Sequence, residues 1–351
     1  MCYKAVSSSD INPVCTFVNP ELLQTVSKSS KASHHAQKAA ARTLDIDIKL
    51  RSSRLTAPRE VRGAGVVGGA RYRVIYDCRE TEVLPGTRVR EENDEKVKDR
   101  SVNNSYNALG IAFNFFHSLF NHDLINSLPL KCSVHYGKDY NNAIWNGEQM
   151  VFGDGDGEVF NYFSDSLDVV VHEFTHAVTQ YTANLEYRDQ AGALNESMSD
   201  VFACMAEQWH FGQTSDQGDW IVGQNLFPLS RKGVALRSLK DPGKAYEDDF
   251  GKDSQVAHMR YYIRTSTDNG GVHKYSGIPN HAFYRAAIEL GGNSWERAGK
   301  IWSKTLTDPR LGPRCTFREF ADLTINIADD LFDSSVGATV RSAWVSVGVL
   351  P

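Results

Sequence analysis

The stretch that decides the fold runs from residue 168 to residue 200 and reads D-V-V-V-H-E-F-T-H-A-V-T-Q-Y-T-A-N-L-E-Y-R-D-Q-A-G-A-L-N-E-S-M-S-D. Its apolar beginning predicts the buried start of a helix that carries His172 and His176, four residues apart. Both imidazoles therefore leave the same face of the helix, about one turn apart. Glu173 lies beside the first His and can reach a water molecule on a shared metal ion.

The end of the same stretch, N-E-S-M-S-D, predicts a second helix that completes the site. Zinc used in catalysis typically takes three protein ligands and leaves one position for water. His172, His176 and Glu196 make such a set of two His and one Glu. Asp200, one helical turn after Glu196, is placed to accept a hydrogen bond from the outer ring nitrogen of a ligating His. The sequence thus predicts one catalytic zinc.

The composition is typical of a soluble globular protein, since 41% of the 351 residues are hydrophobic and 23% are charged. The length predicts two core domains with an appendage. No apolar run is long enough for a membrane span, and the first ten residues lack the apolar core of a secretory signal peptide. The six cysteines are scattered without a C-x-x-C pair. This argues against a redox dithiol and fits a reducing compartment weakly.

Charge is distributed unevenly along the chain. Residues 1–65 contain ten Lys/Arg and five Asp/Glu, hence a net charge of +5, whereas the remainder contains 28 and 38, hence −10. A basic leader that docks on an acidic body would show this pattern. A solvated basic tail would show it too, so the charge alone leaves both interpretations open.

The hydrophobic pattern changes character part-way along the chain. A Gly-rich loop or linker is expected at 58–70, where Gly63, Gly65, Gly68 and Gly69 fall close together. Alternating or apolar runs predict strands at 44–50, 72–78 and 133–136 and a hairpin at 142–152. Helices are expected at 101–121 (with an aromatic face), 165–182, 195–211, 254–264, 279–290, 294–306, 317–331 and 335–346. A strand-rich half followed by a helical half, with the metal-binding helix at the junction, predicts two lobes and a cleft.

From about residue 72 to the C-terminus, the chain resembles the thermolysin family of zinc endopeptidases. The resemblance is carried by motifs in the family's order: Trp145-Asn-Gly, G-D-G-D-G, H-E-F-T-H, Tyr187, N-E-S-M-S-D and Asp268-Asn-Gly-Gly-Val-His273. It implies an α+β, two-lobed thermolysin-like fold with a strand-rich N-terminal lobe, a mainly helical C-terminal lobe and the zinc helix at the junction. The chain looks closest to the protealysin-like branch, whose members carry a short propeptide.

That branch implies that residues 1–65 are a propeptide, followed by peptidase lobes at 66–180 (including the zinc helix) and 181–351. Residues 15–23, C-T-F-V-N-P-E-L-L, resemble the branch's propeptide signature, with Asn19 where Pro is usual. The boundary falls somewhere within 50–68. The chain is therefore expected to be a latent precursor, or zymogen, whose leader blocks the cleft sterically. A Cys15 thiolate on the zinc is the less favoured alternative.

The resemblance also implies the mechanism of a metalloprotease, a zinc-dependent hydrolase of internal peptide bonds. Zinc lowers the pKa of its bound water and polarises the scissile carbonyl. Glu173 accepts the proton of the water and passes it to the leaving amine. By the same resemblance, His273 and Tyr187 donate to the carbonyl oxygen as charge develops, and Asp268 orients His273.

Substrate binding follows from the same resemblance. Asn142 and the backbone of Ala143 match the edge-strand residues that pair with an extended peptide. Arg237 matches the Arg that holds a substrate carbonyl. The apolar pocket for the residue after the scissile bond is matched by Phe160, Val169 and Leu236. This implies cleavage before Leu, Phe, Ile or Val.

Calcium is where the sequence departs from the family's best-known members. Asp168, Glu207 and Asp219 match acidic ligands of their double calcium site, but Ile221 and Gln224 replace two further carboxylates. Closely spaced divalent ions need many negative oxygens. We therefore expect at most one weak calcium site.

Three other classes of protein fit the sequence less well. A metallo-aminopeptidase would need a G-x-M-E-N strand motif, and a serine hydrolase a G-x-S-x-G motif; the sequence contains neither. A non-catalytic zinc-dependent peptide-binding protein would be favoured if Glu173 or His273 were replaced, and both are present. The expected partners are a peptide or protein substrate and the chain's own propeptide, with no nucleic acid or membrane and with a monomeric state. The family implies secretion, while the missing signal peptide leaves a cytoplasmic location or non-classical export open.

Overall fold

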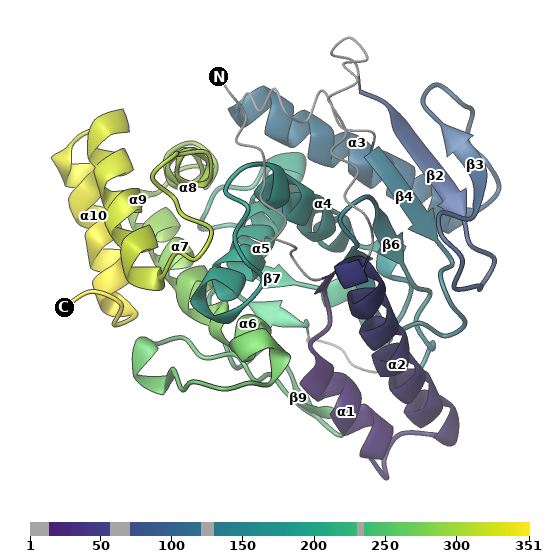
Figure 1. Ribbon diagram of the computed structural model, residues 1–351. Coiled ribbons are helices and arrows are strands. Elements are labelled where there is room, and N and C mark those ends of the chain that lie inside the picture. The colour runs from purple at the N-terminus through teal and green to yellow at the C-terminus, as the bar shows by residue number, and fades with distance from the viewer. Residues whose placement is uncertain (1–13, 57–70, 121–129, 230–234) are drawn as a thin grey trace.

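The computed structural model describes residues 14–56, 71–120, 130–229 and 235–351. The predicted α+β class and the strand-rich and helical halves are confirmed, with the helix of His172 and His176 at their junction (Figure 1). The helices are α1 Pro20–Lys28, α2 His34–Thr56, α3 Arg100–Phe120, α4 Leu167–Tyr181, α5 Asp189–Phe211, α6 Asp268–Tyr275, α7 Gly277–Leu290, α8 Ala298–Leu306, α9 Phe317–Leu331 and α10 Ser334–Ser346.

The main sheet has six strands in the order β1-β5-β6-β4-β2-β3. Their bounds are β1 Cys15–Thr16, β2 Arg73–Asp77, β3 Thr87–Glu91, β4 Leu130–Val134, β5 Ala143–Trp145 and β6 Met150–Phe152. Strand β4 runs parallel to β2 and β6, whereas the β2–β3, β5–β6 and β1–β5 pairs are antiparallel. The predicted hairpin is the β5–β6 pair. Strand β1, which comes from the leader, therefore forms one edge of the sheet beside β5.

Helix α3 joins the sheet to the central helices through its aromatic face. The ring of Phe116 lies 5.4 Å from Phe174 of α4 and 5.1 Å from Phe202 of α5, measured between centroids. All three rings are buried in one apolar core. Burying aromatic side chains contributes much of the free energy of such a core. This packing fixes α4 and α5 against each other and against the sheet.

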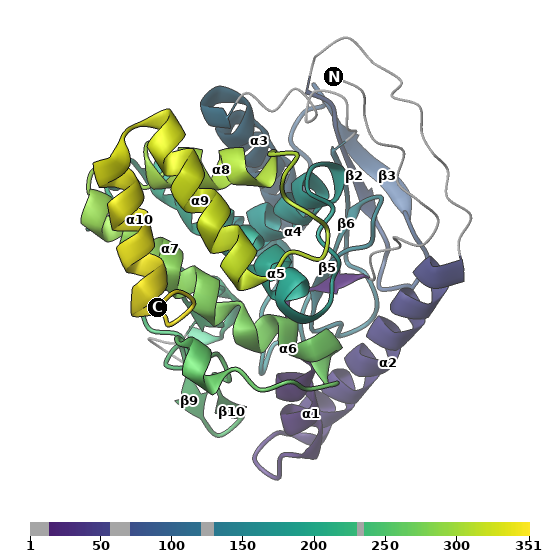
Figure 2. The same ribbon diagram turned by 60° about the vertical axis from the view of Figure 1, so that its left-hand side comes forward.

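The C-terminal lobe is a layer of helices that continues this core. Trp302 of α8 and Trp344 of α10 are fully buried, with their rings stacked 6.1 Å apart. Helix α9 begins at a reciprocal capping box between Thr316 and Glu319, which satisfies donors at its first turn. Figure 2 shows α9 and α10 side by side at the outside of this lobe, and α10 also packs against α7.

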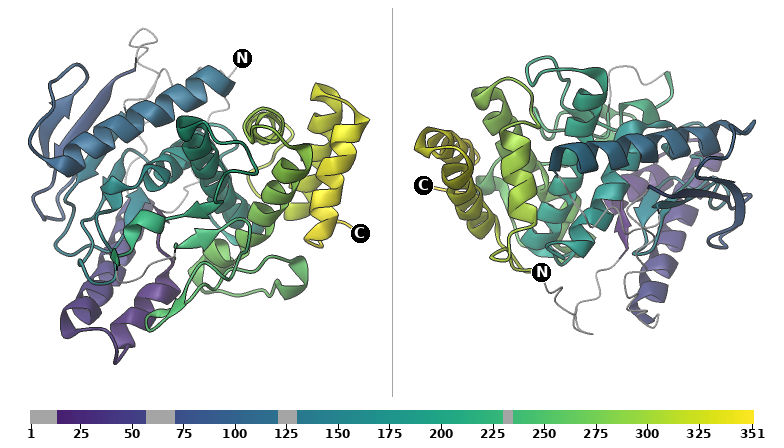
Figure 3. Two further views of the ribbon diagram at one scale, coloured as in Figure 1. Left: turned by 180° about the vertical axis from the view of Figure 1, so that it is seen from behind. Right: turned by 90° about the horizontal axis from the view of Figure 1, so that it is seen from above.

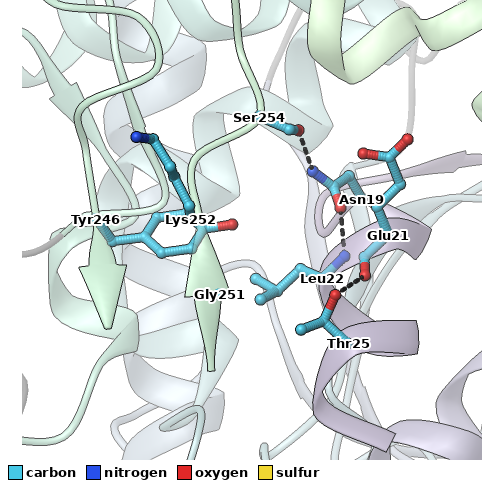
Figure 4. Close-up of a pocket in the computed structure, with 8 residues that line it drawn as sticks. All are labelled: Asn19, Glu21, Leu22, Thr25, Tyr246, Gly251, Lys252 and Ser254. Atoms are coloured by element: carbon cyan, nitrogen blue, oxygen red, sulfur yellow. Dashed lines mark hydrogen bonds between the residues drawn. The ribbon is translucent and has the colours of Figure 1, made fainter. Parts of the chain in front are cut away.

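The leader forms β1 and a pair of helices, α1 and α2, on the opposite side of the molecule from α10 (Figure 3). Asn19 caps α1, because its side-chain oxygen accepts from the amide of Leu22 at 2.7 Å. Its side-chain amide also lies 3.3 Å from the Ser254 hydroxyl of the body (Figure 4). The residue that departs from the propeptide signature thus starts a helix and contacts the peptidase.

Two predicted elements are wrong. Residues 44–50 belong to helix α2 and not to a strand. The buried positions of α2 are 36, 39, 40, 43, 46 and 47, which follow the helical period, and Ile48 is 61% exposed. Seven alternating residues are too short a window to separate the two periods.

Residues 254–264 form an extended loop with one 3-10 turn, η5 Met259–Tyr261, and not a helix. Their amides pair with distant carbonyls, as in Val256 N–H to Lys274 and Met259 N–H to Val347. For the other predicted helices the differences are in the bounds, since α5 begins six residues before the expected 195 and α8 four residues after the expected 294, whereas α1, β3 and α6 were not predicted. The predicted loop at 58–70 lies outside the described residues.

Candidate metal centre and active site

Helix α4 places His172, Glu173 and His176 together in the interior, with ligand atoms within 4.8 Å of one another. The two Nε2 atoms are only 3.1 Å apart, and all three side chains are buried. The spacing follows from the helical turn, and the burial follows from the apolar residues 169–171 that insert the start of α4 into the core.

The outer nitrogen of each imidazole faces a hydrogen-bond acceptor. His172 Nδ1 lies 2.9 Å from Asp200 Oδ1, and His176 Nδ1 lies 2.8 Å from Asn195 Oδ1. Because both partners are acceptors, each ring carries its proton on Nδ1. The lone pairs of both Nε2 atoms are then directed at the shared space between the two rings. Two lone pairs that face each other at this distance repel unless a cation lies between them. Sequence reasoning missed Asn195, although it directly precedes the predicted ligand Glu196.

Glu196 of α5 directs its carboxylate at the space between the two Nε2 atoms. Its two oxygens lie 3.4 Å from His176 Nε2 and 3.5 Å from His172 Nε2. Oε2 of Glu196 and both oxygens of Glu173 are buried without a hydrogen-bond partner among the described residues. Buried carboxylate oxygens without partners are costly. Two imidazoles and one carboxylate directed at one point therefore fit a zinc ion well.

Asp200 links the metal centre to Arg237, which lies on β8 Arg237–Ser238. The carboxylate accepts hydrogen bonds from the Arg237 guanidinium at 2.8–3.0 Å and from Asn280 at 2.9 Å. Burial alone would raise the pKa of Asp200, but Arg237 and His172 outweigh it and hold the pKa below its usual value. Asp200 thus stays ionised while it orients both an imidazole and a guanidinium.

A kink in α6 directs His273 at the metal centre. Asn269, Gly270 and Gly271 have left-handed φ angles of 51°, 94° and 78°, and a Cβ on Gly270 would lie 2.9 Å from the Asp189 backbone. Glycine is therefore required at this close approach. Asp268 accepts from the backbone amide of His273 at 3.0 Å and lies 2.8 Å from its Nδ1.

His273 and Tyr187 meet beside Glu196. The Tyr187 hydroxyl lies 3.4 Å from His273 Nε2 and also donates to Glu196. Burial lowers the pKa of His273, but Asp268 and Glu196 outweigh it and raise the value to about 9. A protonated His273 can donate through Nδ1 and Nε2 together.

The leader lies along the predicted substrate edge. Strand β1 pairs with β5, and the Phe17 amide donates to the Ala143 carbonyl at 2.9 Å. The Val18 amide donates to Asn142 Oδ1 at 2.8 Å. These are the strand-addition contacts that an extended peptide would make.

Two side chains hold consecutive carbonyl groups of the leader. His273 Nε2 lies 2.5 Å from the Thr16 carbonyl oxygen, and Arg237 donates to the Phe17 carbonyl at 2.8 Å. Thr16, Phe17 and Val18 are fully buried. The contacts join positions up to 257 residues apart, which is why the sequence did not reveal them individually.

The Phe17 side chain points into the interior beside the metal centre. Its ring is 4.9 Å from the His172 ring and 6.4 Å from Phe163, and the Arg237 guanidinium lies 4.3 Å from its centroid. The three residues expected to form the apolar pocket are buried in the same core as Phe17: Phe160, Val169 and Leu236. Cys15 packs with Tyr187 and Val272 instead of joining the group of metal-ligand atoms.

Comparison with known proteins identifies the family. Residues 41–180 match the family described as "Thermolysin metallopeptidase, catalytic domain" and residues 183–349 match "Thermolysin metallopeptidase, alpha-helical domain". This chain belongs to the thermolysin metallopeptidase family. It is a zinc metalloendopeptidase made as a precursor.

Relatives within this family cover nearly the whole chain. An "Extracellular metalloprotease" of Pectobacterium carotovorum subsp. carotovorum is 43% identical over 342 residues, 96% of this chain and 97% of the relative. "Protease PrtS" of Photorhabdus sp. (strain Az29) is 47% identical over 289 residues, 81% of this chain and 78% of the relative. The solved precursor of protealysin from Serratia proteamaculans is 44% identical, with a TM-score of 0.86 and coverage of 95% and 99%. The predicted protealysin-like character is thus confirmed.

The predicted calcium residues of this thermolysin relative lie apart from the zinc centre, where α4 begins. Asp168 already accepts the amides of Val169 at 2.8 Å and Gly223 at 2.6 Å. Burial, together with the nearby Asp168 and Asp219, raises the pKa of Glu207. The three carboxylates therefore gather near one another, but part of their oxygen capacity is already used by backbone donors.

No helix among the described residues combines the length and the apolar character needed to cross a membrane. One of the relatives named above is described as an extracellular metalloprotease.

Proposed function

We propose that this chain is a latent zinc endopeptidase that cuts before large apolar residues. The observation that carries the specificity is Phe17, which is fully buried beside His172 while its own amide and carbonyl are held by Ala143 and Arg237. In this register Phe17 occupies the position of the residue after a scissile bond. Burial of a large apolar side chain contributes about 1.5–3 kcal/mol, which favours substrates with such a residue there.

The proposed ligands of the single zinc ion are His172, His176 and Glu196. When bound, zinc would supply an acidified water and polarise the carbonyl of the scissile bond. Glu173 takes a proton from that water and delivers it to the leaving nitrogen. Its two oxygens are buried and have no hydrogen-bond partner in the described part of the chain, so they are available for this role.

The remaining side chains position the substrate and the developing charge. His273 and Tyr187 donate to the carbonyl oxygen of the scissile bond, and their placement is fixed before reaction by Asp268 and Glu196. Arg237, held by Asp200, binds the next carbonyl. Asn142 and Ala143 align the peptide as an added strand.

A set of peptides that differ only in the residue after the scissile bond tests this specificity. The processed enzyme should cut peptides with Phe, Leu, Ile or Val at this position, and kcat/KM should fall at least tenfold with Gly or Asp. A preference for charged or small residues at this position would contradict the proposal.

We also propose the domain bounds, the calcium content, the location and the partners of the enzyme. Residues 1–65 act as a removable leader, ahead of lobes at 66–180 and 181–351. Calcium occupies at most one weak site, formed by Asp168, Glu207 and Asp219. The enzyme is proposed to be a secreted monomer whose partners are its substrate and its own leader.

A further inference from the structure

We propose that the Thr16–Phe17 peptide bond of the leader is itself a substrate, which the precursor cuts in cis to give a nicked enzyme that is still latent. This inference rests on the proposed function and adds a processing site inside the leader, separate from its boundary at 50–68. It is carried by the register of the leader in the cleft.

Four of the groups assigned to the peptidase reaction contact the leader around this one bond: His273, Ala143, Arg237 and Asn142. His273 is directed at the Thr16 carbonyl oxygen, and the Phe17 nitrogen on the other side donates to Ala143. Arg237 and Asn142 hold the next carbonyl and the next amide. A leader that only obstructed the cleft would need none of these contacts in the order of a substrate.

The residue types at the bond also suit cleavage. Phe17 fills the pocket beside His172, as a preferred substrate residue would. Thr16 is an extended β residue paired with Ile144, so its carbonyl is presented from a strand. Because the bond is already held in the active site, its cleavage is a reaction within one molecule. Such positioning lowers the activation free energy by several kcal/mol.

Burial restricts the reaction to the molecule's own active site. Cys15 is 3% exposed, and Thr16, Phe17 and Val18 are 0% exposed. A second enzyme molecule cannot reach this bond while the leader is docked. The nick must therefore form in cis, at a rate that does not depend on protein concentration.

In the proposed step, the oxygen of one water molecule bonds to the Thr16 carbonyl carbon and the bond from that carbon to the Phe17 nitrogen breaks. Glu173 accepts a proton from the water and transfers it to the Phe17 nitrogen. The second proton of the water follows to the same nitrogen, so the products are a Thr16 carboxylate and a Phe17 ammonium group. No redox change occurs, and water is the only co-reactant.

The leader stays docked after the nick, because most of its contacts lie on the Phe17 side. Arg237 and Asn142 still hold Phe17 and Val18. Asn19 contacts Ser254, next to the place where α1 packs against β10 Gly251–Lys252 (Figure 4). In α2, the Asp47 carboxylate accepts hydrogen bonds from the Tyr140 hydroxyl at 2.6 Å and from the Asn142 side-chain amide at 3.0 Å. The cut therefore leaves residues 17 onward in the cleft like a bound product.

The test uses the full-length zinc-loaded precursor at several concentrations, followed by intact mass and N-terminal sequencing. We expect a chain that begins at Phe17 to appear with first-order kinetics, independent of concentration, while activity on an added peptide stays low. A bond that remains intact, or a nick whose rate rises with protein concentration, would overturn the inference. Turnover of the same peptide by the processed enzyme, which lacks the leader, tests the proposed function separately. An active processed enzyme, together with a precursor whose Thr16–Phe17 bond stays intact, therefore refutes only the nick.

Variants of the precursor test the roles of Glu173 and Phe17 in the nick. Glu173→Ala precursor should stay intact at this bond, also when active processed enzyme is added. Phe17→Ala should slow the nick more than about tenfold, and Phe17→Leu should restore most of the rate. Ile48→Ala, at an exposed leader position, is the matched control and should nick at the normal rate. If the Phe17→Ala and Ile48→Ala precursors were nicked at equal rates, the proposed position of Phe17 directly after the cleaved bond would be wrong.

Discussion

At the scale of single residues, two glutamates 23 positions apart carry different tasks in the proposed site. Glu173→Ala should retain zinc and fold normally, while turnover falls about 10²–10⁴-fold through loss of the general base. Glu196→Ala should instead lower zinc occupancy, because it removes a ligand from the set. Zinc stoichiometry measured beside peptide turnover separates the two. Near-normal turnover of a zinc-loaded Glu173→Ala enzyme would show that the mechanism is wrong even where the metal site is right.

Asp47 makes docking of the leader depend on pH. Burial, which outweighs the Tyr140 and Asn142 hydrogen bonds and the attraction of Arg51, raises the pKa of Asp47 from 3.8 to about 6. The docked leader therefore binds a proton that the free leader releases, so docking is strongest in acid and weakens as pH rises through about 4 to 6. The shift corresponds to about 3 kcal/mol.

Hydrogen exchange of the α2 amides in the Glu173→Ala precursor, corrected for intrinsic rates, measures this effect. Opening should cost less free energy at pH 7 than at pH 4. Asp47→Asn mimics the protonated acid, since the Tyr140 hydroxyl can rotate to accept from the amide. This variant should show little pH dependence, and a wild-type-like pH dependence in Asp47→Asn would assign the effect to another group.

At the scale of elements, the start of α4 and the segment after α5 decide the response to calcium. Ile221 of β7 Ile221–Val222 and Gln224 of η3 Gln224–Leu226 offer no carboxylate, and Asp168 already accepts two backbone amides. Calcium should therefore raise the melting temperature by less than about 15 °C. Thermal unfolding with and without calcium, on enzyme that keeps its zinc, checks this. A larger rise would mean that backbone donors give way to a well-formed site.

At the scale of the whole molecule, the docked leader predicts latency. It covers the predicted peptide-binding edge with β1 and lies against the body through α1 and α2. Precursor that cannot lose its leader should hydrolyse an added peptide far more slowly than a chain that begins near residue 66. Initial rates at equal zinc content provide the measurement. Equal rates would show that the leader leaves the cleft spontaneously.

The sequence alone determined the parts of this protein that depend on local spacing. His172, Glu173 and His176 share one helix, and Glu196 and Asp200 share another, so the helical period already placed each group on one face. The strand-rich and helical halves followed from hydrophobic patterns of sufficient length. The same reasoning failed at 44–50 and 254–264, where a short pattern competed with packing and with distant backbone partners.

Only the tertiary structure decided which distant residues meet. Asn195 beside His176, Asp47 beside Tyr140, and the Thr16 carbonyl beside His273 are contacts across 19, 93 and 257 positions. No local period encodes such distances, because they depend on how helices and strands pack around a shared core. Side-chain spacing along a helix is a property of the backbone and can be predicted from the sequence; the peptide that fills the active-site cleft is fixed by the packing of the whole chain.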